Sequence, residues 1–184
     1  MKAVLISIQP QWCEKIAARW KSIELRKSKP NIPVPFKCYI YQTRHKWVFT
    51  LLRSLGKDHL ADTLEAGFAK VIGEFVCDHI LGHCEMANAD VAERQSYVRR
   101  EKIFEYSCGK EVYGWHISDL KIYDKPKKLS EFLNPCKEYE KDDPRCGNCD
   151  FYHSMGEYPA ECACDGLKPL TRPPQSWCYV EEMQ

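Results

Sequence analysis

The segment KSIELRKSKP, residues 21–30, carries charged side chains at a spacing that suits a binding or catalytic site. Successive strand side chains point to opposite faces, so in a strand Ser22, Glu24 and Arg26 would share one face, while the intervening isoleucine and leucine face the core. Lysine and arginine can hold a phosphate or a base edge, and a neighbouring carboxylate can act as acid, base or ion-pair partner. Lys21 and this face therefore indicate either an ion-pair network or an anion-binding site.

Residues elsewhere in the chain are expected to join this group. In the segment KVIGEF, residues 70–75, Glu74 lies on an alternating face, and Gly73 would let another backbone approach closely. We expect Lys21, Glu24, Arg26 and Glu74 to converge, with Trp12 or Trp115 stacking on a base. His116 is either a general acid–base group or a structural histidine.

Cysteine is unusually frequent, with eleven in the chain, and six lie in its last quarter. Cys146 and Cys149 form a C-x2-C pair, a tight turn that supplies two of the four ligands that zinc prefers. Metal binding would also explain how this segment folds, since it is too poor in aliphatic residues to build a core. We predict a structural zinc site made by Cys146, Cys149, Cys162 and Cys164, with Cys136 and Cys178 as alternates. An iron–sulfur cluster, disulfides and free thiols are the alternatives.

The composition is that of a globular protein. Of 184 residues, 44% are hydrophobic and 29% charged, and the net charge is only +1. A nucleic-acid-binding role would therefore need a local basic patch rather than an overall positive charge. The sequence shows no apolar window long enough to cross a bilayer and no signal-peptide pattern, so we predict a cytoplasmic protein without membrane contact.

Strand and helix patterns alternate along the chain and predict an α+β fold. Strands are expected at 2–8, 22–27, 36–42, 69–82 and 112–126, and helices from Pro10, within 44–66 and at 88–107. We expect three parts: a main domain over residues 1–135, a Cys-rich zinc-knuckle insertion over 136–168, and a returning strand over 169–184 that completes the main domain.

Lys21, Glu24 and Arg26 match the pattern K-x-x-E-x-R. Together with LISIQP, VIGEF and GWHISDLKIYDKP, this pattern resembles the ASCH domain, a PUA-like family, and most closely the small stand-alone ASCH proteins of bacteria and their phages. The resemblance implies a mixed β-barrel with flanking helices and a cleft beside the first helix that faces RNA or a nucleotide. Arg19 stands where the family motif has a glycine, and a left-handed turn there would cost a non-glycine residue about 1 kcal/mol.

The resemblance implies several functions. The first is binding of RNA or a nucleotide in the cleft, with Lys21 or Arg26 on a phosphate or base edge. The second is an amidohydrolase that deacetylates acetylcytidine-type nucleosides through Lys21 and Glu74. In that enzyme Glu24 would replace a threonine and repel the negative charge that develops in the transition state. A ribonuclease and a protein-interaction adaptor that uses the Cys-rich insertion are further alternatives.

Overall fold

The computed structural model describes residues 2–44, 46–82, 89–135 and 167–183, and residues 136–166 of the predicted Cys-rich insertion therefore lie outside the described residues. None of the helices in the described ranges has the length and apolar character needed to span a membrane. The elements follow in the order β1 (Lys2–Ile8), α1 (Pro10–Ala17), β2 (Ile23–Arg26), β3 (Phe36–Gln42), α2 (Lys46–Ser54), α3 (Asp58–Gly67), β4 (Lys70–Cys77), β5 (Ile80–Leu81), α5 (Ala89–Ser96), α6 (Arg100–Ser107), β6 (Tyr113–His116), β7 (Ser118–Lys127), η1 (Leu129–Glu131), β8 (Leu133–Pro135), β9 (Leu167–Pro169) and β10 (Trp177–Glu181).

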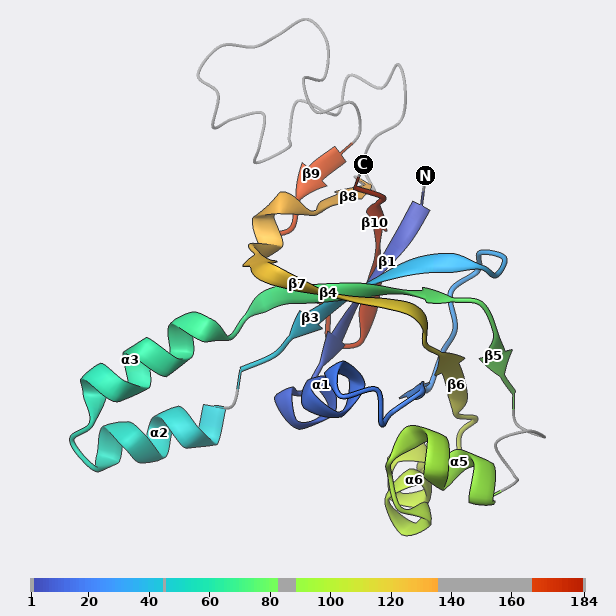
Figure 1. Ribbon diagram of the computed structural model, residues 1–184, viewed down its shortest axis with the longest axis horizontal. Helices are drawn as coiled ribbons and strands as arrows, with labels where there is room; N and C mark the ends of the chain where they lie inside the picture. The colour runs from blue at the N-terminus through green and yellow to red at the C-terminus, as the bar shows by residue number, and fades with distance from the viewer. Residues whose placement is uncertain (1, 45, 83–88, 136–166, 184) are drawn as a thin grey trace, which may run out of the picture.

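The helices and strands form a mixed α+β fold, and the strands of the described residues are arranged in three sheets (Figure 1). The main sheet has the order β10-β1-β3-β4-β7, in which β1 and β3 are parallel and the other neighbours antiparallel. A smaller sheet has the order β2-β6-β5, and β8 pairs with β9. The mixed fold agrees with the sequence prediction, but the strand pairings among the described residues do not close a barrel.

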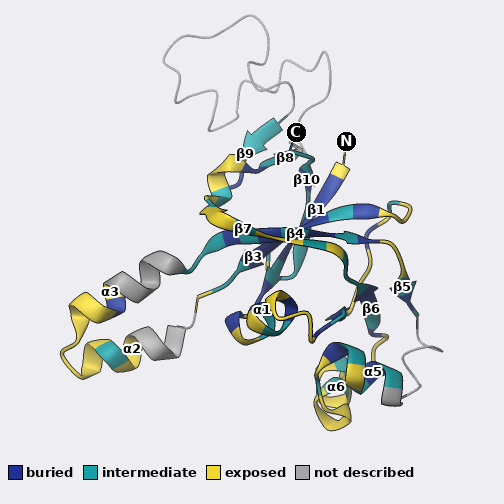
Figure 2. Ribbon diagram, viewed as in Figure 1, coloured by how far each residue is buried: buried dark blue, intermediate teal, exposed yellow. Residues whose placement is uncertain are grey.

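Strands β1 and β3 in the middle of the main sheet are buried on both faces (Figure 2). On β1, Val4 and Ile6 belong to a core cluster that also contains Ile16 of α1. The alternate residues Ala3 and Leu5 belong to a second cluster on the opposite face. Helix α1 therefore covers one face of the sheet, and η1 with the segment around β8 and β9 covers the other.

Helices α5 and α6 pack on the small sheet rather than on the main one (Figure 1). Ile23 and Leu25 of β2 form a third cluster with partly buried residues of the helical segment, which include Val98 and Ile103. The apolar side of β2 is thus explained by the helices that cover it. The charged residues of β2, Glu24 and Arg26, lie on its other face and can take part in a functional site.

Two backbone positions behave as the sequence indicated. Arg19 adopts a left-handed conformation, with φ at 59°, in the turn after α1. At Gly73, a Cβ atom would lie 2.5 Å from the carbonyl oxygen of Lys121, so β7 approaches β4 too closely for any other residue. At Gly73 the chain has the glycine that the close approach requires. In the turn after α1 it has Arg19, so the left-handed conformation there is strained.

Helices α2 and α3 form a hairpin that projects away from the sheets (Figure 1). The amphipathic stretch between β3 and β4 had indicated one or two helices, and the structure has two. Leu51, Leu55 and Leu60 remain exposed on this hairpin. The hairpin therefore contributes little to the core that positions the site.

Candidate functional site

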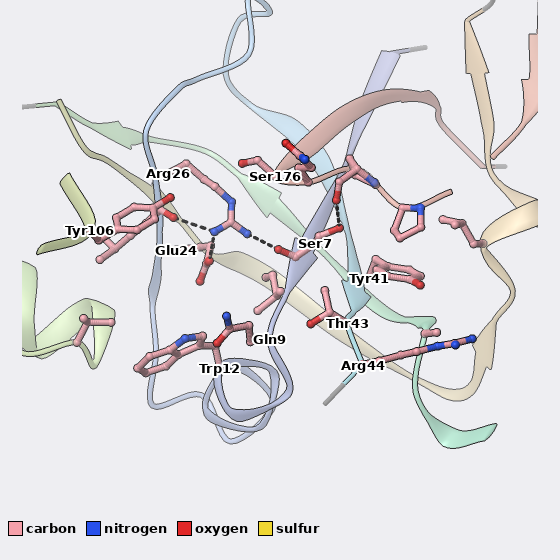
Figure 3. Close-up of a pocket in the computed structure, with 18 of the residues that line it drawn as sticks. Ser7, Gln9, Trp12, Glu24, Arg26, Tyr41, Thr43, Arg44, Tyr106 and Ser176 are labelled. Carbon is pink, nitrogen blue, oxygen red and sulfur yellow. Dashed lines mark hydrogen bonds and ion pairs between the residues drawn. The ribbon is translucent and has the colours of Figure 1, made fainter. Parts of the chain in front are cut away.

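A cavity of about 980 Å³ lies where β1 and β3 end, between α1, β2 and the segment before β10. Because β1 and β3 are parallel, the residues that follow them meet at one edge of the sheet. Figure 3 shows Ser7, Thr43 and Arg44 on one side of this cavity and Trp12, Glu24 and Tyr106 on the other. The lining combines polar, aromatic and aliphatic side chains and includes both signs of charge.

Three charged side chains are buried together beside the cavity, and two of them, Glu24 and Arg26, line it. Lys21, Glu24 and Arg26 are 2%, 4% and 8% exposed, respectively. The Glu24 carboxylate lies 2.5 Å from Arg26 Nη1 through Oε1 and 3.3 Å from Lys21 Nζ through Oε2. Two cations thus face one carboxylate, and when both are protonated the group carries one positive charge in excess.

Arg26 joins the small sheet to the main one. Its Nη2 donates a 2.7 Å hydrogen bond to the carbonyl oxygen of Ser7 in β1, and its Nη1 donates a 2.9 Å bond to that of Leu25. Among the described residues, no acceptor pairs with Arg26 Nε, although this atom is buried. An unpaired buried donor is costly, so a ligand acceptor or a water molecule would stabilise it.

Lys21 has an environment that favours loss of its proton. Burial lowers the pKa of this amine, while the neighbouring Glu24 carboxylate acts in the opposite direction and raises it. The amine donates a 2.7 Å hydrogen bond to the carbonyl oxygen of Ser96 and lies 5.3 Å from the ring centroid of Trp12. Among the described residues that line the cavity, Glu24 and Arg26 are present but Lys21 is not. Its influence on a ligand would therefore pass through Trp12 and Glu24.

Glu74 is not brought to this group, which corrects the expected convergence. It pairs in register with Tyr39, a residue of the core cluster on the other face of the main sheet. Its carboxylate accepts a hydrogen bond from the Tyr123 hydroxyl and lies 3.8 Å from Lys37 Nζ. The strand alternation was correct, but the face that carries Glu74 looks away from Lys21.

Two other expected site residues also lie elsewhere. Trp115 is fully buried in the core between the sheets, where it packs against Phe36 and Trp177. His116 is partly exposed, and its Nδ1 lies 2.6 Å from Asp78 Oδ1. Neither residue is among the described residues that line the cavity. Of the expected aromatic residues, only Trp12 can contact a ligand there.

Several cavity residues were not anticipated from the sequence. They are Ser7, Gln9, Thr43, Arg44, Tyr106 and the segment that contains Ser176. Ser7 to Gln9 and Thr43 to Arg44 sit where β1 and β3 end, so polar residues after parallel strands were a usable signal. Tyr106 had no such signal, because only the packing of α6 brings it to the cavity.

The expected zinc ligands cannot be placed. Cys136, Cys146, Cys149, Cys162 and Cys164 lie outside the described residues. Within the described ranges, no three His, Cys, Asp or Glu side chains gather as a metal site. The alternate ligand Cys178 is described, and it packs half-buried against the core on the β8–β9 side of the main sheet.

The chain matches no protein-family model, and no curated protein matches it. Among solved structures, it is similar to a serine-to-alanine mutant of the ASCH protein from Zymomonas mobilis. That similarity has 14% sequence identity and a TM-score of 0.54, and it covers 98% of this chain and 89% of the other. The unmutated ASCH protein from the same organism is 17% identical over 69% of this chain and 73% of its own, with a TM-score of 0.49. The chain therefore has an ASCH-like fold.

Proposed function

We propose that this protein binds a nucleotide or a single-stranded segment of RNA in the cavity beside α1. The observation that carries the proposal is the buried group of Lys21, Glu24 and Arg26, of which Glu24 and Arg26 line the cavity together with Trp12 and Tyr106. When Lys21 is protonated this group carries an excess positive charge that an anion stabilises, and the guanidinium of arginine matches the geometry of a phosphate.

The aromatic residues give the proposal its second part. Trp12 and Tyr106 both line the cavity on the side of Glu24 (Figure 3). Unpaired bases stack on such rings, and their polar edges hydrogen-bond to nearby side chains. Across the cavity, Arg44 and Thr43 offer a cation and a hydroxyl. The lining can therefore receive a base on one side and a phosphate on the other.

Binding of nucleoside monophosphates and short single-stranded RNA, measured by calorimetry, tests this proposal. Arg44 lines the cavity and is exposed, so Arg44→Ala should weaken binding about tenfold without disturbing the fold. Arg53→Ala is the matched control, since this arginine lies on the projecting hairpin and pairs with Asp62 at its surface. Affinity for RNA should fall steeply as salt rises. If the wild-type protein bound neither probe, or Arg44→Ala had no effect, the proposal would be wrong.

The amidohydrolase alternative has less support. It relies on Glu74 as a partner of Lys21, but Lys21 pairs with Glu24 and Ser96, whereas Glu74 on the main sheet pairs with Tyr123 and Lys37. The alternative would regain support if the protein hydrolysed N4-acetylcytidine, lost this activity in Lys21→Met and kept it in Glu74→Gln. A carboxylate other than Glu74 would then act with Lys21. The adaptor alternative depends on the Cys-rich insertion, and a co-purified protein lost on its deletion would favour it.

A further inference from the structure

Two exposed aromatic rings stack on each other outside the cavity. Trp20, in the turn between α1 and β2, is 60% exposed, and Tyr97, between α5 and α6, is 46% exposed. Their ring centroids are 6.0 Å apart, and the ring planes differ by 21°. Two large aromatic side chains that adjoin in solvent form a small apolar patch, and contact with a partner would remove it from water.

A lysine accompanies the pair. The ammonium of Lys15 in α1 lies 5.8 Å from the ring centroid of Trp20 and 4.8 Å from that of Tyr97. Both rings extend from hydrogen-bonded backbone, because Trp20 N donates to Lys15 O and Tyr97 N donates to Glu93 O, each at 2.9 Å. Flat rings together with a nearby cation are the groups that contact a base and its phosphate in single-stranded nucleic acid.

The pair lies beside the cavity wall. Trp20 directly precedes Lys21, whose ammonium faces the ring of the cavity residue Trp12 at 5.3 Å. Tyr97 directly precedes Val98, which lines the cavity itself. The hydrogen bond from Lys21 Nζ to Ser96 O joins the two segments at this seam. A nucleic-acid strand that leaves the cavity past Val98 would therefore meet the stacked rings.

We infer that Trp20 and Tyr97, with Lys15, form a second base-stacking subsite for the nucleotide next to the one in the cavity. This inference rests on the proposed function, since it requires a single-stranded nucleic acid as the ligand. It assigns the cavity to one nucleotide and the exposed pair to a neighbour, so affinity should depend on the length of the strand. Stacking on aromatic rings tolerates every base, and little sequence preference is expected at this subsite.

Binding of a mononucleotide and of a short oligonucleotide to the full-length protein separates the two subsites. Trp20→Ala should weaken oligonucleotide binding about tenfold and leave the mononucleotide affinity unchanged. Trp20→Phe keeps a ring and should retain most of the affinity. Phe104→Ala is the matched control, because Phe104 is another exposed aromatic residue, at 76%, on the neighbouring helix α6. The tryptophan fluorescence of the wild type should also be quenched more by the oligonucleotide than that of Trp20→Phe.

The outcomes distinguish the inference from the proposed function. If Trp20→Ala weakened both ligands equally, the pair would be a clamp that holds α5 and α6, and the inference would be overturned. If Trp20→Ala changed neither affinity while Arg44→Ala weakened both, the subsite would be absent but the cavity function would stand. If the wild type bound no nucleic acid, both proposals would fail together.

Discussion

The ammonium of Lys21 donates a 2.7 Å hydrogen bond to the backbone carbonyl of Ser96, a residue 75 positions later in the chain. This bond attaches the end of α5 to the turn that precedes β2. It occupies one of the three hydrogens of an amine that Glu24 also faces at 3.3 Å. The position of the helical segment and the charge state of the site are thus linked through one side chain.

Glu24 should be the most sensitive residue of the buried group. Glu24→Gln leaves Lys21 and Arg26 buried without a countercharge, which we expect to lower the free energy of unfolding by about 3–5 kcal/mol. Loss of the carboxylate also lowers the pKa of Lys21 further, so the unfolded chain binds a proton that the folded chain lacks. The loss in free energy of unfolding, relative to the wild type, should therefore be larger at pH 7 than at pH 10.

Urea denaturation at both pH values checks this prediction. Glu14→Gln is the control, because Glu14 is an exposed carboxylate on α1, and its change should stay within about 0.5 kcal/mol. Equal losses in the two variants would mean that the buried charges contribute nothing specific to stability.

The turn after α1 should be improved by glycine. Arg19 has a φ of 59°, a conformation that is unfavourable for residues with a Cβ atom. Its Nη2 also donates a 3.3 Å hydrogen bond to Leu120 O, which any truncation removes. Arg19→Ala and Arg19→Gly both lose that bond, and only glycine relieves the backbone. We expect thermal denaturation to place Arg19→Gly about 1 kcal/mol above Arg19→Ala, and an equal stability would contradict the strain argument.

Alkaline pH should destabilise the fold through buried thiols. Burial, with a smaller contribution from Asp78, raises the pKa of Cys77 to about 12, well above its ordinary value. The folded state therefore keeps a proton that the unfolded state releases, so this stabilisation is complete below about pH 8.5 and is lost as pH rises through 12. The free energy of unfolding should fall by up to about 1.4 kcal/mol per pH unit for this group.

Denaturation of Cys77→Ala across the same pH range isolates this contribution. The variant should show a shallower decline, whatever its stability at neutral pH. Cys108→Ala removes an exposed thiol and should keep the wild-type slope. Parallel slopes in all three proteins would show that Cys77 ionises equally in the folded and unfolded states.

The zinc prediction is tested by elemental analysis of protein purified without chelator. We expect about one zinc atom per chain, and its loss in Cys146→Ser and Cys149→Ser, because a C-x2-C pair supplies half of a structural site. Cys108→Ser should retain the metal. Fewer than about 0.5 zinc atoms per wild-type chain would contradict the prediction, and iron in place of zinc would indicate a cluster.

Local features of the fold were accessible from the sequence. Pro10 marks the start of α1, and the alternation in residues 22–26 gives β2 its apolar and charged faces. The close approach at Gly73 followed from residue type, and the strain at Arg19 followed from the resemblance to a family motif that has glycine there. These features depend on a few consecutive residues, whose backbone and side-chain directions are set by local geometry.

Only the tertiary structure decided which faces meet. Glu24 and Glu74 occupy similar positions in alternating strands, yet Glu24 looks into the cavity and Glu74 toward Tyr123 on the other side of the main sheet. Trp115 became core because its side chain, on the middle strand of the small sheet, packs into the core cluster of the main sheet, and Tyr106 reached the cavity through the packing of α6. A strand's sequence fixes which side chains share a face but not what covers it, because that depends on contacts between residues far apart in the chain.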